Sequence, residues 1–120
     1  MKKILLLIIF LLIINLSGCL SSVNYNLNIT VHNKSDYNKN FTVVVQDSNS
    51  NEVFNNTFSL IPNQSEKILD ITNENGIYTI LFFINNNLTI EDNNIHIGKG
   101  YGPVEIYVYN DRSKLHQQQD

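Results

Sequence analysis

The sequence contains a single cysteine, Cys19, and no alanine or tryptophan among its 120 residues. One cysteine cannot form an intramolecular disulfide, so a small fold held by such bonds is excluded and the domain depends on a packed core. Alanine is the best helix former, whereas asparagine, which favours turns, occurs nineteen times after Cys19. The composition therefore argues against a helical protein.

An apolar leader occupies the N-terminus. Lys2 and Lys3 precede eleven consecutive apolar residues, 4–14. This run is shorter than the roughly 20 residues that a membrane-spanning helix needs, but it has the length of the central region of a secretory signal peptide. Small residues and the cysteine follow closely, in the order Leu16-Ser17-Gly18-Cys19.

This tetrapeptide resembles the lipobox of prokaryotic lipoproteins. The resemblance implies that residues 1–18 are a cleaved signal helix, that Cys19 carries a thioether-linked lipid, and that the protein is anchored on the extracytoplasmic face of the cytoplasmic membrane. An ordinary signal peptide that ends near a cysteine, or an uncleaved N-terminal anchor, is the alternative. Residues 19–24 then form the lipidated terminus and a short linker, of which residues 20–23 span at most about 13–14 Å.

The charge of the remaining chain is mildly acidic. Without residues 1–18 it holds six Lys and Arg against eleven Asp and Glu, a net charge of −5. Nucleic-acid backbones and anionic headgroups would repel such a surface. We therefore expect no nucleic-acid partner, and we expect a protein partner at the membrane or in the envelope.

Apolar residues after Cys19 recur with a period of two, which indicates β-strands. The strands expected from this alternation cover residues 24–32, 41–46, 52–60, 67–71, 76–84, 88–91 and 104–109. Residues 95–97 either extend the strand 88–91 after a bulge at residues 93–94 or lie outside it. The strand 76–84 is apolar on both faces, as is typical of a strand inside a sheet. About seven short strands separated by turn residues predict an antiparallel β-sandwich over residues 25–110. Residues 111–120 lack periodicity and are expected to be a disordered tail.

Three segments resemble motifs of immunoglobulin-like domains. Residues 74–80 resemble the acidic-x-Gly-x-Tyr pattern that opens strand F, and Tyr78 would be the corner tyrosine that bonds back to the backbone. Residues 29–33 and 41–43 resemble the B–C strand pair of prokaryotic surface modules such as the cell-adhesion-related CARDB domains, and residues 60–65 resemble a turn of the same group. The resemblance implies an immunoglobulin-like sandwich and a binding or adhesion role.

Two apolar-aromatic pairs define a candidate partner-binding surface. Leu81 and Phe83 point outward from one expected strand, and Tyr107 and Tyr109 point outward from the last one. If these two strands are neighbours, the four side chains form one exposed patch of the kind that marks protein interfaces. The alternative is that the tail or a further strand covers them.

The glycine-rich segment Gly98–Pro103 is expected to be a flexible loop that presents Tyr101 and Lys99. The strand pattern is also similar to that of the intracellular proteinase inhibitor family. An envelope protease inhibitor that inserts this loop into a protease cleft is therefore the alternative to a lipid-anchored binding or adhesion module.

The chain contains several Asn-x-Ser/Thr sequons, and Asn33 and Asn63, both expected in turns, are the candidate glycosylation sites. The spacing of His32, His96 and His116 fits no recurring metal site, and the sequence suggests no catalytic Ser/His/acid or Cys/His arrangement. We therefore expect that the protein is not an enzyme and that it binds no cofactor and no metal.

Overall fold

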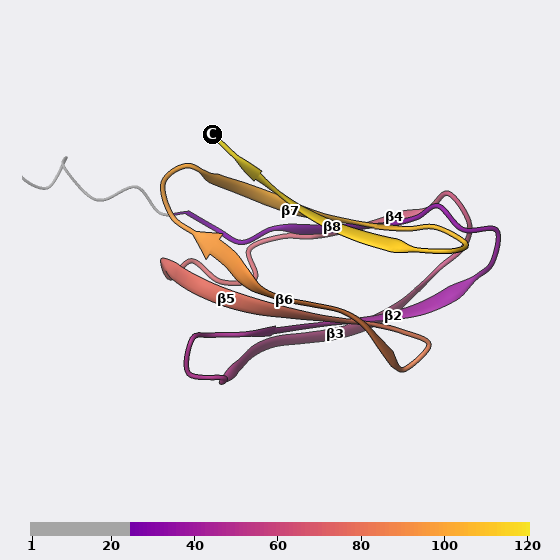
Figure 1. The fold of residues 1–120 in the computed structure, drawn as a ribbon, viewed down its shortest axis with the longest axis horizontal. Coiled ribbons are helices and arrows are strands. Elements are labelled where there is room, and N and C mark those ends of the chain that lie inside the picture. The colour runs from indigo at the N-terminus through magenta and orange to yellow at the C-terminus, as the bar shows by residue number, and fades with distance from the viewer. Residues whose placement is uncertain (1–24) are drawn as a thin grey trace, which may run out of the picture.

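The computed structural model, which describes residues 25–120, consists of two packed β-sheets (Figure 1). No helix occurs within these residues. The eight strands, in chain order, are β1 (Ile29–Asn33), β2 (Lys39–Gln46), β3 (Glu52–Leu60), β4 (Ser65–Ile68), β5 (Gly76–Ile84), β6 (Asn87–Ile97), β7 (Tyr101–Val108) and β8 (Ser113–Gln119).

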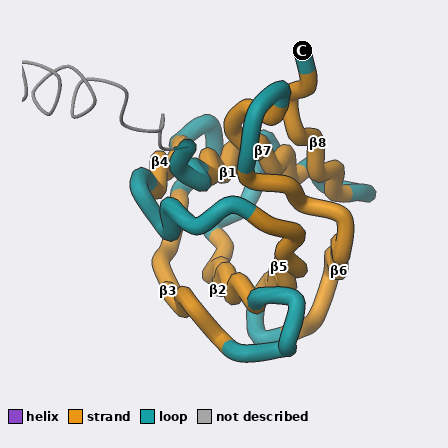
Figure 2. The backbone as a smooth tube through the Cα atoms, turned by 90° about the vertical axis from the view of Figure 1, so that its left-hand side faces the viewer, coloured by secondary structure: helices purple, strands orange, loops and turns teal. Residues whose placement is uncertain are grey.

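Each sheet has four strands. Sheet A has the order β4-β1-β7-β8, and sheet B has the order β3-β2-β5-β6. All neighbouring strands are antiparallel except β1 and β7, which are parallel. Seen end on, the sheets form the two layers of a sandwich (Figure 2). The coarse prediction of an all-β sandwich rich in antiparallel pairs is thus confirmed.

The core lies between the two sheets and is built from alternate residues of the strands. Fully buried side chains include Ile29, Val31, Phe41, Val43, Val45, Ile80, Phe82, Val104, Ile106 and Val108. The rings of Phe41 and Phe82 stack with centroids 5.5 Å apart, across the β2–β5 pair. Burying each large apolar side chain contributes about 1.5–3 kcal/mol, which explains how the domain folds without a disulfide.

Asparagine supplies much of the turn geometry. Asn85 and Asn86, with φ angles of 49° and 68°, form the two-residue turn between β5 and β6. Asn63, with φ 66°, lies in the β3–β4 connection. Asn tolerates the left-handed region better than other residues with a Cβ, which suits it to these tight connections.

Two strands have the bounds that the sequence predicted, β3 and β5. The two apolar faces of β5 also predicted its place inside a sheet, and β5 lies between β2 and β6. The number of strands is eight rather than about seven.

The prediction of a disordered tail over residues 111–120 is wrong. Residues 113–119 form β8, which pairs with β7 at the edge of sheet A. Leu115 packs against the core, and the Gln117 amide donates to the carbonyls of His96 and Gly102 at 2.7 and 3.1 Å. The sandwich therefore continues to the end of the chain instead of stopping at residue 110.

The leader, the lipobox and Cys19 lie outside the described residues, so their predicted roles remain predictions. Within residues 25–120, the structure contains no helix long and apolar enough to span a membrane.

Candidate functional site

The expected apolar-aromatic patch does not exist as one surface. Leu81 and Phe83 are on β5 in sheet B, whereas Tyr107 is on β7 in sheet A and Tyr109 follows it. All four are half-buried. Outward residues of the two sheets point away from each other, so these pairs lie on opposite faces of the sandwich. The condition for a single patch, that these two strands are neighbours, is not met.

The outer face of sheet A instead carries a set of polar and aromatic side chains, which we call the polar face. The strand register defines two adjacent rows across the sheet. One row contains Lys67, Thr30, Glu105 and His116, and the other contains Ser65, His32, Tyr107 and Lys114. Each residue is two positions from its counterpart in the other row, so all eight side chains lie on the same face.

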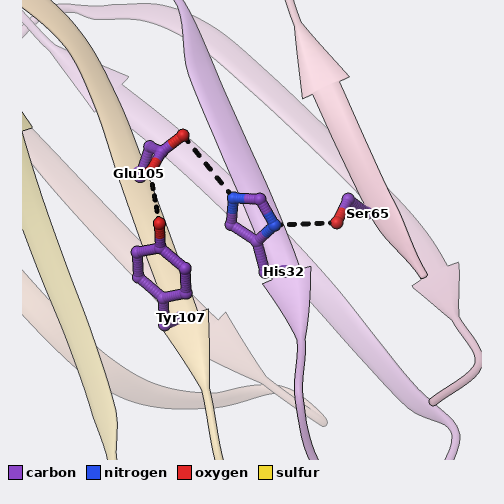
Figure 3. A network of polar contacts seen from close by, with 4 residues as sticks. All are labelled: His32, Ser65, Glu105 and Tyr107. Atoms are coloured by element: carbon purple, nitrogen blue, oxygen red, sulfur yellow. Dashed lines mark hydrogen bonds and ion pairs between the residues drawn. The ribbon is translucent and has the colours of Figure 1, made fainter. Parts of the chain in front are cut away.

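At the centre of the polar face, four side chains from three strands are in mutual contact (Figure 3). The His32 ring stacks on Tyr107, with centroids 4.6 Å apart and an interplanar angle of 8°. Its Nδ1 lies 2.8 Å from Ser65 Oγ, and its Nε2 lies 3.7 Å from Glu105 Oε1. The Tyr107 hydroxyl donates to the other Glu105 oxygen.

Electrostatics determine which tautomer of His32 this arrangement favours. If Nδ1 accepts a hydrogen bond from the Ser65 hydroxyl, the neutral ring carries its proton on Nε2 and points it at the carboxylate of Glu105. The other tautomer would point a lone pair at that negative charge. Nε2 has no hydrogen-bond partner although it is buried, because 3.7 Å is too long for a hydrogen bond.

The contacts shift two pKa values in opposite directions. The Tyr107 hydroxyl bond lowers the pKa of Glu105 below its ordinary value of 4.5; partial burial opposes this effect, and the nearby imidazoles of His32 and His116 add to it. The same bond to the carboxylate raises the pKa of Tyr107 above 10. The pair is therefore most stable as a carboxylate beside a neutral phenol.

These shifts predict a pH-dependent loss of stability on substituting Glu105→Gln. Because the folded pKa is lowered, the contribution of the carboxylate is present above pH 4.5 and disappears as the pH falls through the folded value. The contribution of Tyr107 is present below pH 10 and disappears as the pH rises through its raised pKa. Urea unfolding of both proteins between about pH 2 and 8 should show the difference shrinking under acid.

Glu91→Gln is the control for this experiment, because Glu91 is exposed on β6 in the other sheet. A stability difference for Glu105→Gln that stays constant across the pH range would contradict the assignment.

A small pocket adjoins the network. Its volume is about 190 Å³, and it is lined by Asn28, Thr30, Lys67, Leu69, Pro103 and Glu105. This volume is below the roughly 300–1,000 Å³ of drug-sized ligand sites. It can hold one small polar group or one side chain of a partner, between the ammonium of Lys67 and the carboxylate of Glu105.

A larger groove of about 610 Å³ lies between the edges of β6 and β8, where its lining includes Asp92, Ile95 and Gln117. Gln117 accepts from the His96 backbone amide at 3.0 Å and donates to its carbonyl, so it joins the two sheets at this edge. Since the Gln117 contacts in this groove join the sheets, we do not place the candidate site there. We place it on the polar face, where a pocket adjoins charged and aromatic side chains.

The sequence pattern did not predict one arrangement of three polar side chains, in which His32 lies between Ser65 and Glu105. The side chains come from β4, β1 and β7, and only the strand register reveals them as neighbours. A hydroxyl, an imidazole and a carboxylate in this order can in principle activate a nucleophile. Here the imidazole–carboxylate distance exceeds a hydrogen bond, and Ser65 is exposed outside the pocket beside Glu105.

The segment Gly98–Pro103 is not the flexible loop that was expected. β6 continues to Ile97 and β7 begins at Tyr101, so only a three-residue turn remains. The Tyr101 ring stacks on His96 with centroids 4.4 Å apart. Lys99 is exposed in the turn, but Tyr101 is fixed within the sheet, which leaves a protruding protease-binding loop without structural support.

The two predicted glycosylation sites differ in exposure. Asn33 is fully buried at the end of β1, where its amide donates to the carbonyls of Tyr37 and Leu60, so the folded domain cannot present it to a glycosyltransferase. The expectation that Asn33 lies in a turn is wrong, because it is the last residue of β1, and its burial argues against its modification. Asn63 is exposed in the β3–β4 turn, and its modification remains a prediction.

Among residues 25–120, no group of three or more His, Cys, Asp or Glu side chains is placed to hold a metal ion. The polar face therefore offers hydrogen bonds, charge and one aromatic ring to a ligand. No protein-family model, curated protein or solved structure matches the sequence.

Proposed function

We propose that the protein is a non-catalytic binding module, anchored on the extracytoplasmic face of the cytoplasmic membrane by a lipid on Cys19, and that the polar face is its binding surface. The observation that carries this proposal is the network of His32, Ser65, Glu105 and Tyr107 beside a pocket. Mutual contacts fix these side chains before a ligand arrives, which reduces the entropy cost of binding.

Strand pairing supports an immunoglobulin-like identity for this module. The pairs β1–β4, β2–β5, β2–β3 and β5–β6 correspond to B–E, C–F, C–C′ and F–G of that fold. The Tyr78 hydroxyl donates to the Glu74 carbonyl at 2.7 Å, as a corner tyrosine does. The departure is that β7 occupies the place of strand A and runs parallel to β1.

The site suits a partner in the membrane or envelope. The short linker 19–24 leads directly into the segment before β1, so sheet A is the sheet joined to the proposed anchor. Lys67, Lys114 and Arg112 place positive charge on or beside the polar face of an otherwise acidic protein. A partner with carboxylates and hydrogen-bonding groups would match this surface.

Site-specific photocrosslinking in intact membranes tests the proposal. A photoreactive residue at Thr30, in the middle of the polar face, is expected to capture a specific partner. Addition of Glu105→Lys is expected to abolish the capture, because a lysine cannot accept the Tyr107 hydroxyl or face His32 as an ion-pair partner, and the network is lost. Thr79 is the matched control, because it is also a half-buried threonine but points outward from β5 in sheet B. Equal capture from both positions, or capture from neither, would refute the assignment of the surface.

The anchor is tested in the same membranes. Cys19→Ser is expected to prevent incorporation of a clickable fatty acid and to release the protein from the membrane fraction, since a lipid is what holds such a domain there. A Cys19→Ser protein that stays membrane-bound and is cleaved at the same place would show that the lipid assignment is wrong.

A further inference from the structure

The four sheet edges differ in how they are protected from pairing with another chain. An exposed edge strand invites such pairing unless charge, irregularity or short length prevents it. β4 has only four residues and carries Glu66 and Lys67. β6 is interrupted by two register shifts and carries Glu91 and Asp92. β8 carries Lys114 and His116, and its Gln117 joins it to β6.

β3 forms the edge of sheet B opposite β6 (Figure 2), and it lacks these protective features. It has nine residues, of which only the first, Glu52, is charged, and it contains neither proline nor glycine. From Phe54 to Leu60 it pairs with β2 without a register shift. β3 is therefore the long, regular and neutral edge of the sandwich, and the one suited to accept another strand.

The central five residues of β3, 54–58, are nearly symmetric about Asn56. Phe54 and Phe58 flank the centre at two residues, and Asn55 and Thr57 flank it at one. We propose that two copies of this protein pair through β3 in antiparallel orientation, with a two-fold axis at Asn56, so that two sheets B form one continuous eight-stranded sheet. This inference concerns the sheet opposite the polar face and does not depend on the proposed function.

The symmetric register brings matching side chains together. Phe54 of one copy lies opposite Phe58 of the other, on the core-facing side, where both rings are half-buried in the single chain. Aromatic pairs at directly opposed strand positions are stabilising. On the outer side, Asn55 lies opposite Thr57, and these uncharged groups can exchange hydrogen bonds.

The near-symmetric sequence favours a second copy of this chain as the occupant, and the neutral edge permits it. The chain has a net charge of −3, so two copies repel each other overall. Residues 53–60 carry no charge and can approach their own symmetry mate without such a penalty. An edge pairing alone buries less than the roughly 1,000 Å² of a stable interface, so we expect a weak, reversible dimer.

Disulfide trapping of the full-length chain tests the inference. In a Cys19→Ser background, Asn56→Cys places one cysteine on the proposed axis, where opposed Cβ atoms are about 4.5–5.5 Å apart. Mild oxidation is expected to trap a covalent dimer at least about tenfold faster than for Asn87→Cys, another exposed asparagine, on the β6 edge. Equal rates for the two variants would overturn the proposal.

A second variant separates pairing from chance collision. Asn55→Lys adds an edge charge, which is expected to reduce trapping at Asn56→Cys about tenfold or more, whereas Asn55→Ser preserves it. Thermal unfolding verifies that both proteins fold. The assignment would be overturned if Asn55→Lys left the trapping rate unchanged. It would also be overturned if a photoreactive residue at Asn56 captured a different protein and no second copy.

Discussion

Replacing Asn33 with alanine is expected to lower the free energy of unfolding by about 3–4 kcal/mol. The side chain is fully buried, and its amide donates to the carbonyls of Tyr37 and Leu60 at 2.9 and 3.0 Å. Its oxygen accepts from the backbone amide and the hydroxyl of Ser35. Alanine would remove the Asn33 partner of the buried Leu60 carbonyl and of the buried Ser35 amide, and each unsatisfied group costs about 1–3 kcal/mol.

Denaturant unfolding of Asn33→Ala and Asn87→Ala provides the measurement. Asn87 is exposed and is also the first residue of a sequon, so its substitution should change stability by less than about 0.5 kcal/mol. If Asn33→Ala were as mild as Asn87→Ala, the buried network would not hold the β1–β2 loop, and the objection to glycosylation at Asn33 would lose its basis.

The sequence predicts the local strands well because alternation is a property of neighbouring residues. In β5, Tyr78, Ile80 and Phe82 face the core while Leu81 and Phe83 cover the outer side of the sheet, and both faces are apolar in the sequence. The pattern is strong enough to give the bounds of the strand and its inner position.

β8 was missed because its inward positions hold only one apolar residue. The inward positions of β8 are Ser113, Leu115 and Gln117. Because two of them are polar, the sequence does not show the two-residue apolar period of a strand. The amide of Gln117 satisfies backbone groups that an apolar residue could not, so a polar residue is suitable there. A hydrophobic pattern cannot reveal a strand that is held mainly by hydrogen bonds.

The polar face depends on strand order, which local patterns do not determine. His32 and Glu105 are far apart in the chain and meet because β1 and β7 are parallel neighbours. The expected apolar patch failed for the same reason, since β5 and β7 belong to different sheets. The alternation of residues along each strand predicted which side chains point away from the core. It did not predict which strands are neighbours in one sheet.

Removing residues 111–120 is expected to destabilise the domain by about 4 kcal/mol, although the sequence suggested a dispensable tail. The loss of Leu115 packing costs about 1–2 kcal/mol, and each of the three hydrogen bonds of the Gln117 side chain contributes about 1 kcal/mol. Small domains have a total stability of about 5–15 kcal/mol, so the truncated chain should unfold at much lower denaturant concentration.

Point variants within the glutamine run distinguish strand pairing from a general effect of shortening. Gln117→Ala should cost about 2–3 kcal/mol, because it removes the bonds between the β6 and β8 edges, whereas the exposed Gln119→Ala should change stability by less than about 0.5 kcal/mol. Denaturant unfolding curves of the truncated chain, Gln117→Ala and Gln119→Ala, each compared with the unmodified protein, measure these differences. If truncation leaves the midpoint unchanged, β8 adds nothing to the sandwich; if Gln117 and Gln119 behave alike, the amide bridge is not what attaches it.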